Sequence, residues 1–434
     1  MLEGVGVKYS HLPRTTALCA ALVLASQVPS LAIAQSNAPQ ALVIGVDHAD
    51  LANQQPQANR VFEYTDFFSR EASVHSGDTV DFRFAPGSFH VIALAPSEAA
   101  GRSTYPVALV DTEDPRVAPG TGFPKLILGP GNGPIHGGAI GGGGQVGGPN
   151  DLPSCGLTGF GQKPCTFSSA ASIEGSGGIA GFNPDNGQPM PVDWMVQVSA
   201  PVGDYSYFCY IHPGMSGTLH VVSGSQPAST QADVDAASNQ QFQADQAAGL
   251  AAEKQYNVDQ VTVEGTTSTG ITRTHHVSVG VSAANNHVAI DEMLPQRINV
   301  SPGEQVEFKW RDGHNVHTVG IAQAESQLPQ PFVFDCGATF VSPPGPEGQP
   351  GGICLEPGAD QPEFIGDPGN AISGTVLKSV QNIVDSGFLA GPDYGVQPTV
   401  QTWSVATSNA TQNGTYNYWC SVHDFMHGTL VVGT

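Results

Sequence analysis

Two short segments of this 434-residue chain place a thiol, an imidazole and a thioether at the same spacing. They are Cys209, His212 and Met215 in the first segment, and Cys420, His423 and Met426 in the second. In both, an aromatic stretch precedes the cysteine, and a Gly-Thr-Leu sequence begins two residues after the methionine. A lone cysteine three residues before a histidine is common by chance, but this whole pattern occurring twice is not. The two segments therefore predict two metal sites.

Each of the two segments lies at the end of a longer repeat, so the chain is a duplication. An earlier part of each repeat supplies a second imidazole. Val74–Phe84 and Val300–Trp310 share a period-two alternation that predicts a β-strand, and each leads into another apolar strand. That following strand carries His90 in the first repeat and His317 in the second. His314 is a rival candidate in the second repeat, because it stands in a Gly-His-Asn sequence. We favour His317, since only His317 aligns with His90.

Each predicted site thus offers one thiolate, two imidazoles and one thioether. Structural zinc sites take four strong ligands, usually with two or more cysteines, and calcium and magnesium take oxygen ligands. One cysteine, two histidines and a weak axial methionine are the ligands of a blue (type 1) copper site. We therefore predict two type 1 copper sites. Their expected ligands are His90, Cys209, His212 and Met215 in the first, and His317, Cys420, His423 and Met426 in the second.

The other cysteines fit this interpretation. Apart from one in the N-terminal segment, the chain has three cysteines per repeat, in the same order. We predict disulfides between Cys155 and Cys165 and between Cys336 and Cys354, because an exported protein meets an oxidising compartment. One thiol per repeat is then left unpaired, and coordination to a metal would protect it.

The two loops resemble those of the cupredoxins, the family of plastocyanin, azurin and amicyanin. The spacing from Cys209 to Met215 is most similar to the short ligand loop of amicyanin. The resemblance covers about residues 75–95, 196–222, 298–322 and 401–433. It implies two Greek-key β-sandwiches, each with copper near one end, an upstream histidine at a strand start and three ligands in the loop before the last strand. It also implies that His212 and His423 lie at the surface as exit ligands for electrons.

Composition agrees with an all-β fold. The chain has 53 glycines and 34 prolines but only 12% charged residues, which favours short strands and many turns over long solvated helices. We expect long loop insertions at Pro119–Pro189 and Cys336–Pro398, the first of which contains a glycine-rich run at 129–148. The sequence does not indicate what these insertions do.

The expected organisation has four parts. They are a signal peptide at 1–34, a first cupredoxin domain at 40–224, a linker at 225–260 and a second cupredoxin domain at 261–434. Within the linker, Gln241–Tyr256 could form a helix. The Ala-Ile-Ala sequence ending at Ala34 resembles a cleavage site, so we expect a secreted or periplasmic protein without a membrane span. A net charge of −23 disfavours nucleic acid as a partner, and a redox partner protein is expected instead.

Three function classes are compatible with these sites, and the sequence favours one-electron transfer without catalysis. Multicopper oxidases and copper nitrite reductases, which are also built from cupredoxin repeats, place extra histidines beside the type 1 cysteine. Cys209 and Cys420 have no histidine neighbour, and we expect His275, His276 and His287 to be surface or core residues. Copper storage or delivery is the third class, but such carriers tend to be rich in exposed methionine, and this chain has six.

Overall fold

The computed structural model describes most of the two repeats. The described residues are 41–48, 62–86, 88–104, 107–112, 123–128, 155–157, 163–180, 191–266, 270–328, 332–335, 363–366, 371, 373–387, 389–390, 402–423 and 425–433. The predicted signal peptide, the glycine-rich run and the predicted Cys336–Cys354 disulfide lie outside them.

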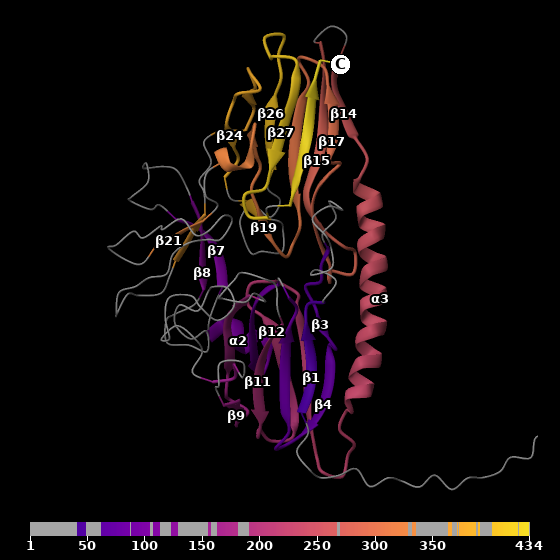
Figure 1. Cartoon of the computed structure of the whole chain (residues 1–434), viewed down its shortest axis with the longest axis vertical. Coiled ribbons are helices and arrows are strands. Elements are labelled where there is room, and N and C mark those ends of the chain that lie inside the picture. Colours follow the sequence, from indigo (N-terminus) through magenta and orange to yellow (C-terminus); the bar gives the residue numbers. More distant parts are fainter. Residues whose placement is uncertain are drawn as a thin grey trace, which may run out of the picture. The chain divides into compact units, whose positions relative to one another are not determined.

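The first repeat folds into two five-stranded sheets, in the orders β3-β1-β5-β11-β9 and β10-β6-β12-β13-β4 (Figure 1). The strands of the first sheet are β1 (Ala41–Val46), β3 (Phe67–Phe68), β5 (Thr79–Phe84), β9 (Cys165–Phe167) and β11 (Val192–Val198). Those of the second are β4 (Glu71–His75), β6 (Phe89–Ala95), β10 (Glu174–Ala180), β12 (Gly203–Cys209) and β13 (Ser216–Val222). Buried and more exposed residues alternate along β1 and β11, as expected for strands with one face toward a core.

The second repeat folds in the same way, into a seven-stranded sheet (β2-β16-β15-β18-β26-β23, with β14 on β15) and a five-stranded one (β17-β28-β27-β20-β24). The first contains β2 (Phe62–Glu63), β14 (Gln260–Thr266), β15 (Gly270–Ser282), β16 (Ala289–Leu294), β18 (Gln305–Arg311), β23 (Thr375–Val376) and β26 (Thr402–Ala406). The second contains β17 (Arg297–Val300), β20 (Gly320–Ala322), β24 (Val384–Asp385), β27 (Gly414–Trp419) and β28 (His427–Val432). β19 (Val316–His317) and β25 (Leu389–Ala390) form a separate pair. The prediction of an all-β fold with two sandwiches is confirmed.

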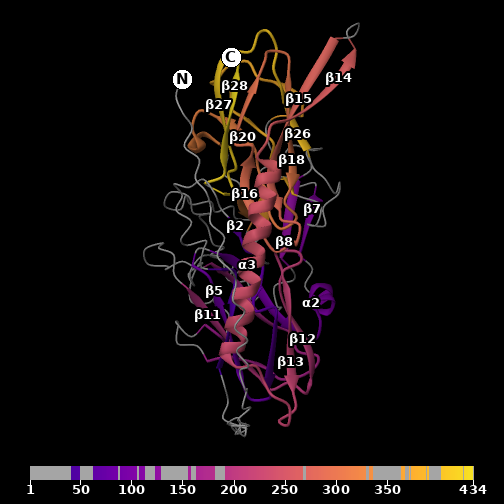
Figure 2. The same ribbon diagram turned by 90° about the vertical axis from the view of Figure 1, so that its right-hand side faces the viewer.

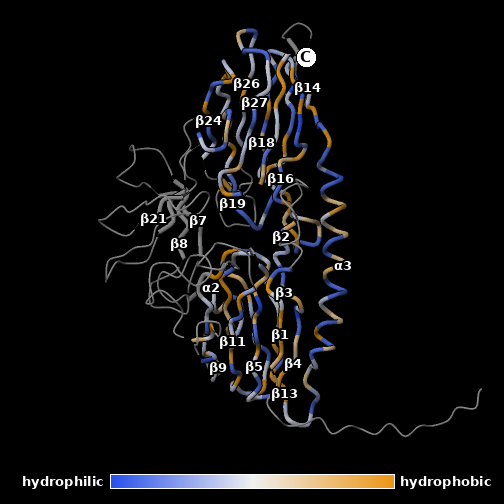
Figure 3. Tube along the Cα trace, viewed as in Figure 1, coloured by the Kyte–Doolittle hydropathy of each residue, from blue (hydrophilic) through white to orange (hydrophobic). Residues whose placement is uncertain are grey.

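Aromatic side chains fill both cores at corresponding positions. In the first sandwich, the Phe82 ring lies 5.4 Å from that of Trp194 and 5.5 Å from that of Tyr207. In the second, the Phe308 ring lies 5.2 Å from that of Tyr418. Hydrophobic and hydrophilic residues alternate along many of these strands (Figure 3). The alternation read from the sequence therefore marks the core-facing residues correctly.

The linker is more helical than the sequence suggested. α3 spans Gln231–Tyr256, so it begins ten residues before the predicted helix. Its start is fixed by a capping box, in which the Thr230 side chain accepts a hydrogen bond from the Asp233 backbone and the Asp233 carboxylate accepts one from the Thr230 backbone. α3 contacts β1 and β3 of the first sandwich and β15 and β16 of the second (Figures 1 and 2).

The two repeats share one strand and one hydrophobic cluster. β2 precedes most of the first sandwich in the chain, yet it pairs with β16 of the second, with Phe62 opposite Ile290 and Glu63 opposite Ala289. A separate core cluster combines aromatic residues of the first repeat with aliphatic residues of the second. It contains Phe62, Tyr64, Phe68, Ala252, Val281, Ala283, Val288, Ile290 and Leu294. The domain boundaries drawn from the sequence stay a prediction.

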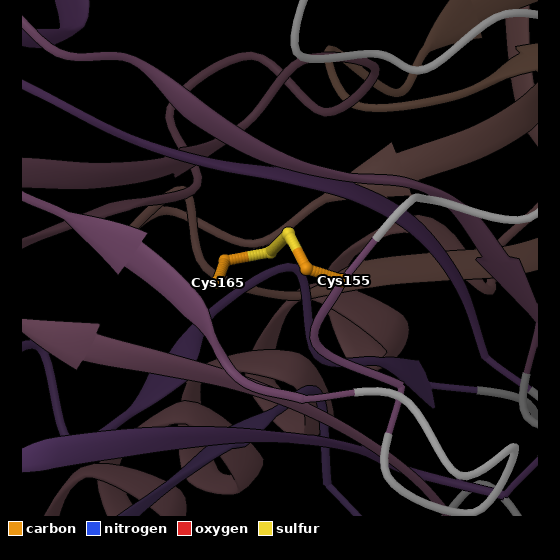
Figure 4. The surroundings of a disulfide bond; sticks show 2 residues. All are labelled: Cys155 and Cys165. Atoms are coloured by element: carbon orange, nitrogen blue, oxygen red, sulfur yellow. A yellow bond between two sulfur atoms is a disulfide. The ribbon is translucent and has the colours of Figure 1, made fainter.

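The insertions contain strands as well as loops. The predicted disulfide between Cys155 and Cys165 is present (Figure 4), and Cys165 is the first residue of β9. β8 (Phe123–Leu128) pairs with β22 (Glu363–Gly366), so the insertions of the two repeats meet in one sheet. That sheet also contains β7 (Val107–Thr112) and β21 (Phe332–Asp335), while α2 (Glu98–Thr104) and a 3₁₀ turn (Glu325–Gln327) complete the described elements. In the described part of the chain, no helix has both the length and the apolar character to cross a membrane.

Candidate metal centres

The first candidate site lies between β6 and the loop that joins β12 to β13. His90 is the second residue of β6, Cys209 ends β12, and Met215 directly precedes β13. The Nδ1 atoms of His90 and His212 lie 2.9 Å apart, and the Cys209 Sγ lies 3.5 Å from the His212 Nδ1. All four residues are buried. The structure thus brings together the residues that the sequence predicted for this site.

Backbone hydrogen bonds hold the loop of the first site closed. The Cys209 N–H donates to the Met215 carbonyl at 3.0 Å, and the Met215 N–H donates to the His212 carbonyl at 3.2 Å. The Val91 N–H points at the Cys209 Sγ from 3.5 Å. These bonds close the segment from Cys209 to Met215 into a tight turn.

The second candidate site repeats this arrangement. The Cys420 N–H donates to the Met426 carbonyl at 2.9 Å, and the Met426 N–H donates to the His423 carbonyl at 2.8 Å. The Nδ1 atoms of His317 and His423 lie 3.1 Å apart, and the Cys420 Sγ lies 3.7 Å from the His423 Nδ1. The Thr318 N–H points at this sulfur from 3.4 Å, as Val91 does in the first site.

The structure places His317, rather than His314, beside the second cysteine. The Cys420 Sγ lies 3.9 Å from the His317 Nδ1. A hydrogen bond two residues after each upstream histidine also matches between the sites. The Ile92 N–H, after His90, donates to the Ser176 hydroxyl, and the Val319 N–H, after His317, donates to the Ser386 hydroxyl. Ser176 and Ser386 therefore occupy equivalent positions in the two repeats. The His314 ring is buried, and neither of its nitrogens has a hydrogen-bond partner among the described residues.

The donor atoms fit a copper ion in each site. The sulfur and the two imidazole nitrogens lie within 4.8 Å of one another in both groups, and the methionines are buried beside them. Carboxylates fix the orientation of both upstream imidazoles, since the His90 Nε2 lies 3.4 Å from the Asp47 Oδ2 and the His317 Nε2 lies 3.1 Å from the Asp312 Oδ2. A carboxylate on the far nitrogen leaves Nδ1 free to bind a metal and increases its basicity.

These carboxylates also control the charge of the buried imidazoles. Burial alone would lower the pKa of His90, but its hydrogen bonds to Asp47 and Cys209 outweigh burial and raise that pKa to about 10. In the second site, burial would raise the pKa of Asp312, but the His317 ring and the charge of His314 hold it below its usual value. Asp47 and Asp312 are candidate site residues that the sequence analysis missed, because nothing in their spacing links them to the ligand loops.

The expectation that His212 lies at the surface is wrong. The residue is only 4% exposed, and its Nε2 atom lies 3.6 Å from the Glu63 Oε1. Glu63 belongs to β2, which the resemblance to single-domain proteins could not place at this position. His423 in the second site is half-buried.

The remaining histidines singled out in the sequence do not form a third site. His275 lies between Asp259 and Glu304, and its neighbour His276 contacts Glu307. The ring of His287 lies 3.8 Å from a carboxylate oxygen of Asp66. Among the described residues, the three-member groups that combine a thiol with imidazoles are the two sites above.

Each sandwich therefore carries its upstream histidine at the start of a strand or just before one, and its other three candidate ligands in the loop before the last strand. This is the arrangement that the resemblance implied. The two sheets of each sandwich and this placement of the candidate ligands make the fold cupredoxin-like. Whether the ligand loops belong to the amicyanin type stays a prediction.

Several solved structures of copper proteins are similar to this chain, all at low identity and with low TM-scores. No family model and no curated protein sequence matches the chain. Plastocyanin from Dryopteris crassirhizoma is 19% identical over 36% of this chain and 99% of its own, with a TM-score of 0.16. Auracyanin from Roseiflexus castenholzii is 13% identical over 42% of this chain and 97% of its own, with a TM-score of 0.19. A copper-containing nitrite reductase from Thermus scotoductus is 11% identical over 91% of this chain and 68% of its own, with a TM-score of 0.19.

Proposed function

We propose that this chain is an exported copper protein that binds one type 1 copper in each sandwich and carries single electrons for a redox partner protein. The observation that supports this most strongly is the duplicated site. Two repeats, with different surrounding residues, keep the same thiolate, the same pair of imidazole Nδ1 atoms and the same buried methionine. One thiolate, two imidazoles and a weak thioether are the ligands of blue-copper electron-transfer sites.

A type 1 copper would supply a one-electron couple, and the protein would supply a rigid set of donors for it. The hydrogen bonds within each ligand loop hold the cysteine and the methionine at fixed positions. Ser176 and Ser386, which accept hydrogen bonds from the backbone of Ile92 and Val319, hold the segments that carry the upstream histidines. Burial keeps water away from the donors. A site that changes little in geometry between its two redox states exchanges electrons with little reorganisation.

An oxidase or a nitrite reductase is the alternative from the enzyme class. It would need further histidines grouped around a second kind of copper site. His275, His276 and His287 contact carboxylates in separate places, which supports the carrier over the enzyme. Copper storage has less support, because backbone hydrogen bonds close both ligand loops and all the donor residues except the half-buried His423 are buried.

The test is to load the purified mature protein with copper, quantify the metal, and record visible and electron paramagnetic resonance (EPR) spectra. We expect two coppers per chain, a blue absorption band and narrow type 1 hyperfine splitting. Cys209→Ser and Cys420→Ser should each remove one copper and its share of the band. His427→Ala is the matched control, since this ring lies next to Met426 but turns toward the Phe425 carbonyl.

Other results would favour the alternatives. A third copper per chain, or an additional type 2 signal, would support the enzyme. Rapid transfer of copper to a chelator would support storage. Absence of a blue band in the copper-loaded protein would refute the proposal. Cell fractionation, with mass determination of the N-terminus, tests export and cleavage after Ala34.

A further inference from the structure

His212, the ligand that the resemblance assigned to electron exchange at the surface, points toward the second repeat. Its Nε2 atom lies 3.6 Å from the Glu63 Oε1, and Glu63 is part of the second sandwich's sheet through the pairing of β2 with β16. Gly214, two residues after His212, packs close to Asn286 and His314 of the second repeat. The loop that would normally face solvent is therefore covered by this chain's own second repeat.

From Glu63, polar contacts continue to the second candidate site. The Asn315 side-chain amide donates to the Glu63 Oε2 at 2.5 Å and to the Asp291 Oδ1 at 3.3 Å. The Asp291 Oδ1 in turn lies 4.0 Å from the Nε2 of His317. Five side chains thus connect one ligand set to the other. We call His212, Glu63, Asn315, Asp291 and His317 the polar bridge, and all five are buried.

We propose that the polar bridge passes electrons between the two copper sites, with Glu63 as the residue that positions the contact between the repeats. This inference rests on the proposed one-electron function. In each exchange, one site is oxidised by losing an electron and the other is reduced by gaining that same electron. No bond forms or breaks, and no proton or further reactant is required. The two sites of one chain would then share the electrons they hold, up to two, rather than act as independent carriers.

The test measures redistribution of electrons within the full-length, copper-loaded protein. A Met426→Leu background makes the two sites unequal in potential, because the axial ligand tunes the potential of a blue-copper site. A short reducing pulse delivers less than one electron per chain, to both sites, and absorbance then follows transfer to the site of higher potential. We expect a first-order phase with a rate that does not depend on protein concentration.

Glu63→Ala in that background should slow this phase on the order of tenfold or more. Glu63→Gln keeps a side chain of the same size that can accept the Asn315 hydrogen bond, so it should restore most of the rate. Asp81→Asn changes another buried carboxylate, outside the polar bridge, and should leave the rate unchanged. EPR spectra of each variant report whether the copper sites themselves are intact.

If Glu63→Ala alters either copper spectrum, Asn315→Leu interrupts the bridge from the other side and replaces it as the test. A redistribution rate that rises with protein concentration would overturn the proposal, because electrons would then move between molecules. So would an unchanged rate in both Glu63→Ala and Asn315→Leu. Failure of the proposed function is distinguishable, since a chain without type 1 copper would show no blue band before any pulse is applied.

Discussion

Each candidate copper thiolate receives a backbone N–H from the residue after the upstream histidine. Val91 provides it to Cys209 and Thr318 provides it to Cys420. An N–H dipole directed at sulfur stabilises its negative charge, so the thiolate form, which binds metal, is favoured. The segment that supplies the upstream histidine therefore also stabilises the thiolate of the cysteine. For this reason the identity of the upstream histidine matters in each repeat.

His314 and His317, the two candidates for the upstream ligand of the second site, should differ sharply when each is changed to alanine. His317→Ala removes an imidazole that lies 3.9 Å from the Cys420 sulfur, so the second site should lose its type 1 spectrum. His314→Ala should retain both copper signals. Visible and EPR spectra with copper quantification measure both effects. Loss of the second type 1 signal in His314→Ala, with its retention in His317→Ala, would reverse the assignment.

Asp81 should make stability depend on pH in mildly acidic solution. Burial, together with the negative charge of Asp193, raises the pKa of Asp81 from 3.8 to about 6. Between these values the folded state holds a proton that the unfolded state releases, so the free energy of unfolding falls as pH rises from about 4 through 6. Asp81→Asn removes this ionisation.

Urea unfolding of the parent protein and of Asp81→Asn at pH 4.5 and at pH 7.5 checks this prediction. Asparagine can still accept the hydrogen bond from Arg83 but never carries the carboxylate charge, so the variant can differ from the parent in stability at both pH values. Its stability relative to the parent should nevertheless be higher at pH 7.5 than at pH 4.5. A relative stability that is equal at the two pH values, or that changes in the opposite direction, would contradict the raised pKa.

At the scale of the strands, the glycine of each Gly-Thr-Leu sequence permits a buried tyrosine to cross the neighbouring strand. A Cβ atom added at Gly217 would lie 2.2 Å from the Tyr207 ring, and one added at Gly428 would lie 2.3 Å from the Tyr418 ring. Both tyrosine hydroxyls donate to a backbone carbonyl, at Ser69 and at Pro295. The glycines are thus part of the packing that supports β13 and β28, directly after the ligand loops.

Gly217→Ala and Gly428→Ala should therefore destabilise the protein, each by about 1–3 kcal/mol as expected for overpacking. Gly224→Ala is the control, because a Cβ atom there would meet nothing within 4 Å. Denaturant unfolding, with the blue absorption as a second probe, gives the free energy changes. If Gly217→Ala were as stable as Gly224→Ala, the tyrosine ring could move aside and the packing argument would not hold.

The ligand loops and the core strands could be predicted from sequence because their signals are local. Cys209, His212 and Met215 lie within one turn-sized segment, and the alternation in β11 and β18 marks the buried face directly. Asp47 and Glu63 could not be predicted, since each reaches a site through pairing with distant strands. The early start of α3 was signalled by Thr230 and Asp233, but its helical stretch is poor in apolar residues and reads as a linker.

At the scale of the whole molecule, two links beyond the polar bridge join the sandwiches. Phe62, Tyr64 and Phe68 of the first repeat pack in one cluster with aliphatic residues of β15 and β16. Arg70 of the first repeat binds Asp66 and also Asp245, a buried residue of α3. α3 contacts both sandwiches, so unfolding of either sandwich would expose apolar surface of the other.

The two copper sites should consequently be lost in one cooperative transition. Leu42→Ala creates a cavity in the first core and should cost about 2–5 kcal/mol. In a Cys209→Ser background, where only the second site is blue, Leu42→Ala should lower the temperature at which that second band disappears. Leu250→Ala, at a position 42% exposed on α3, is the matched control and should have little effect. If the second band disappeared at an unchanged temperature, the sandwiches would unfold independently, and their shared cluster would contribute little to stability.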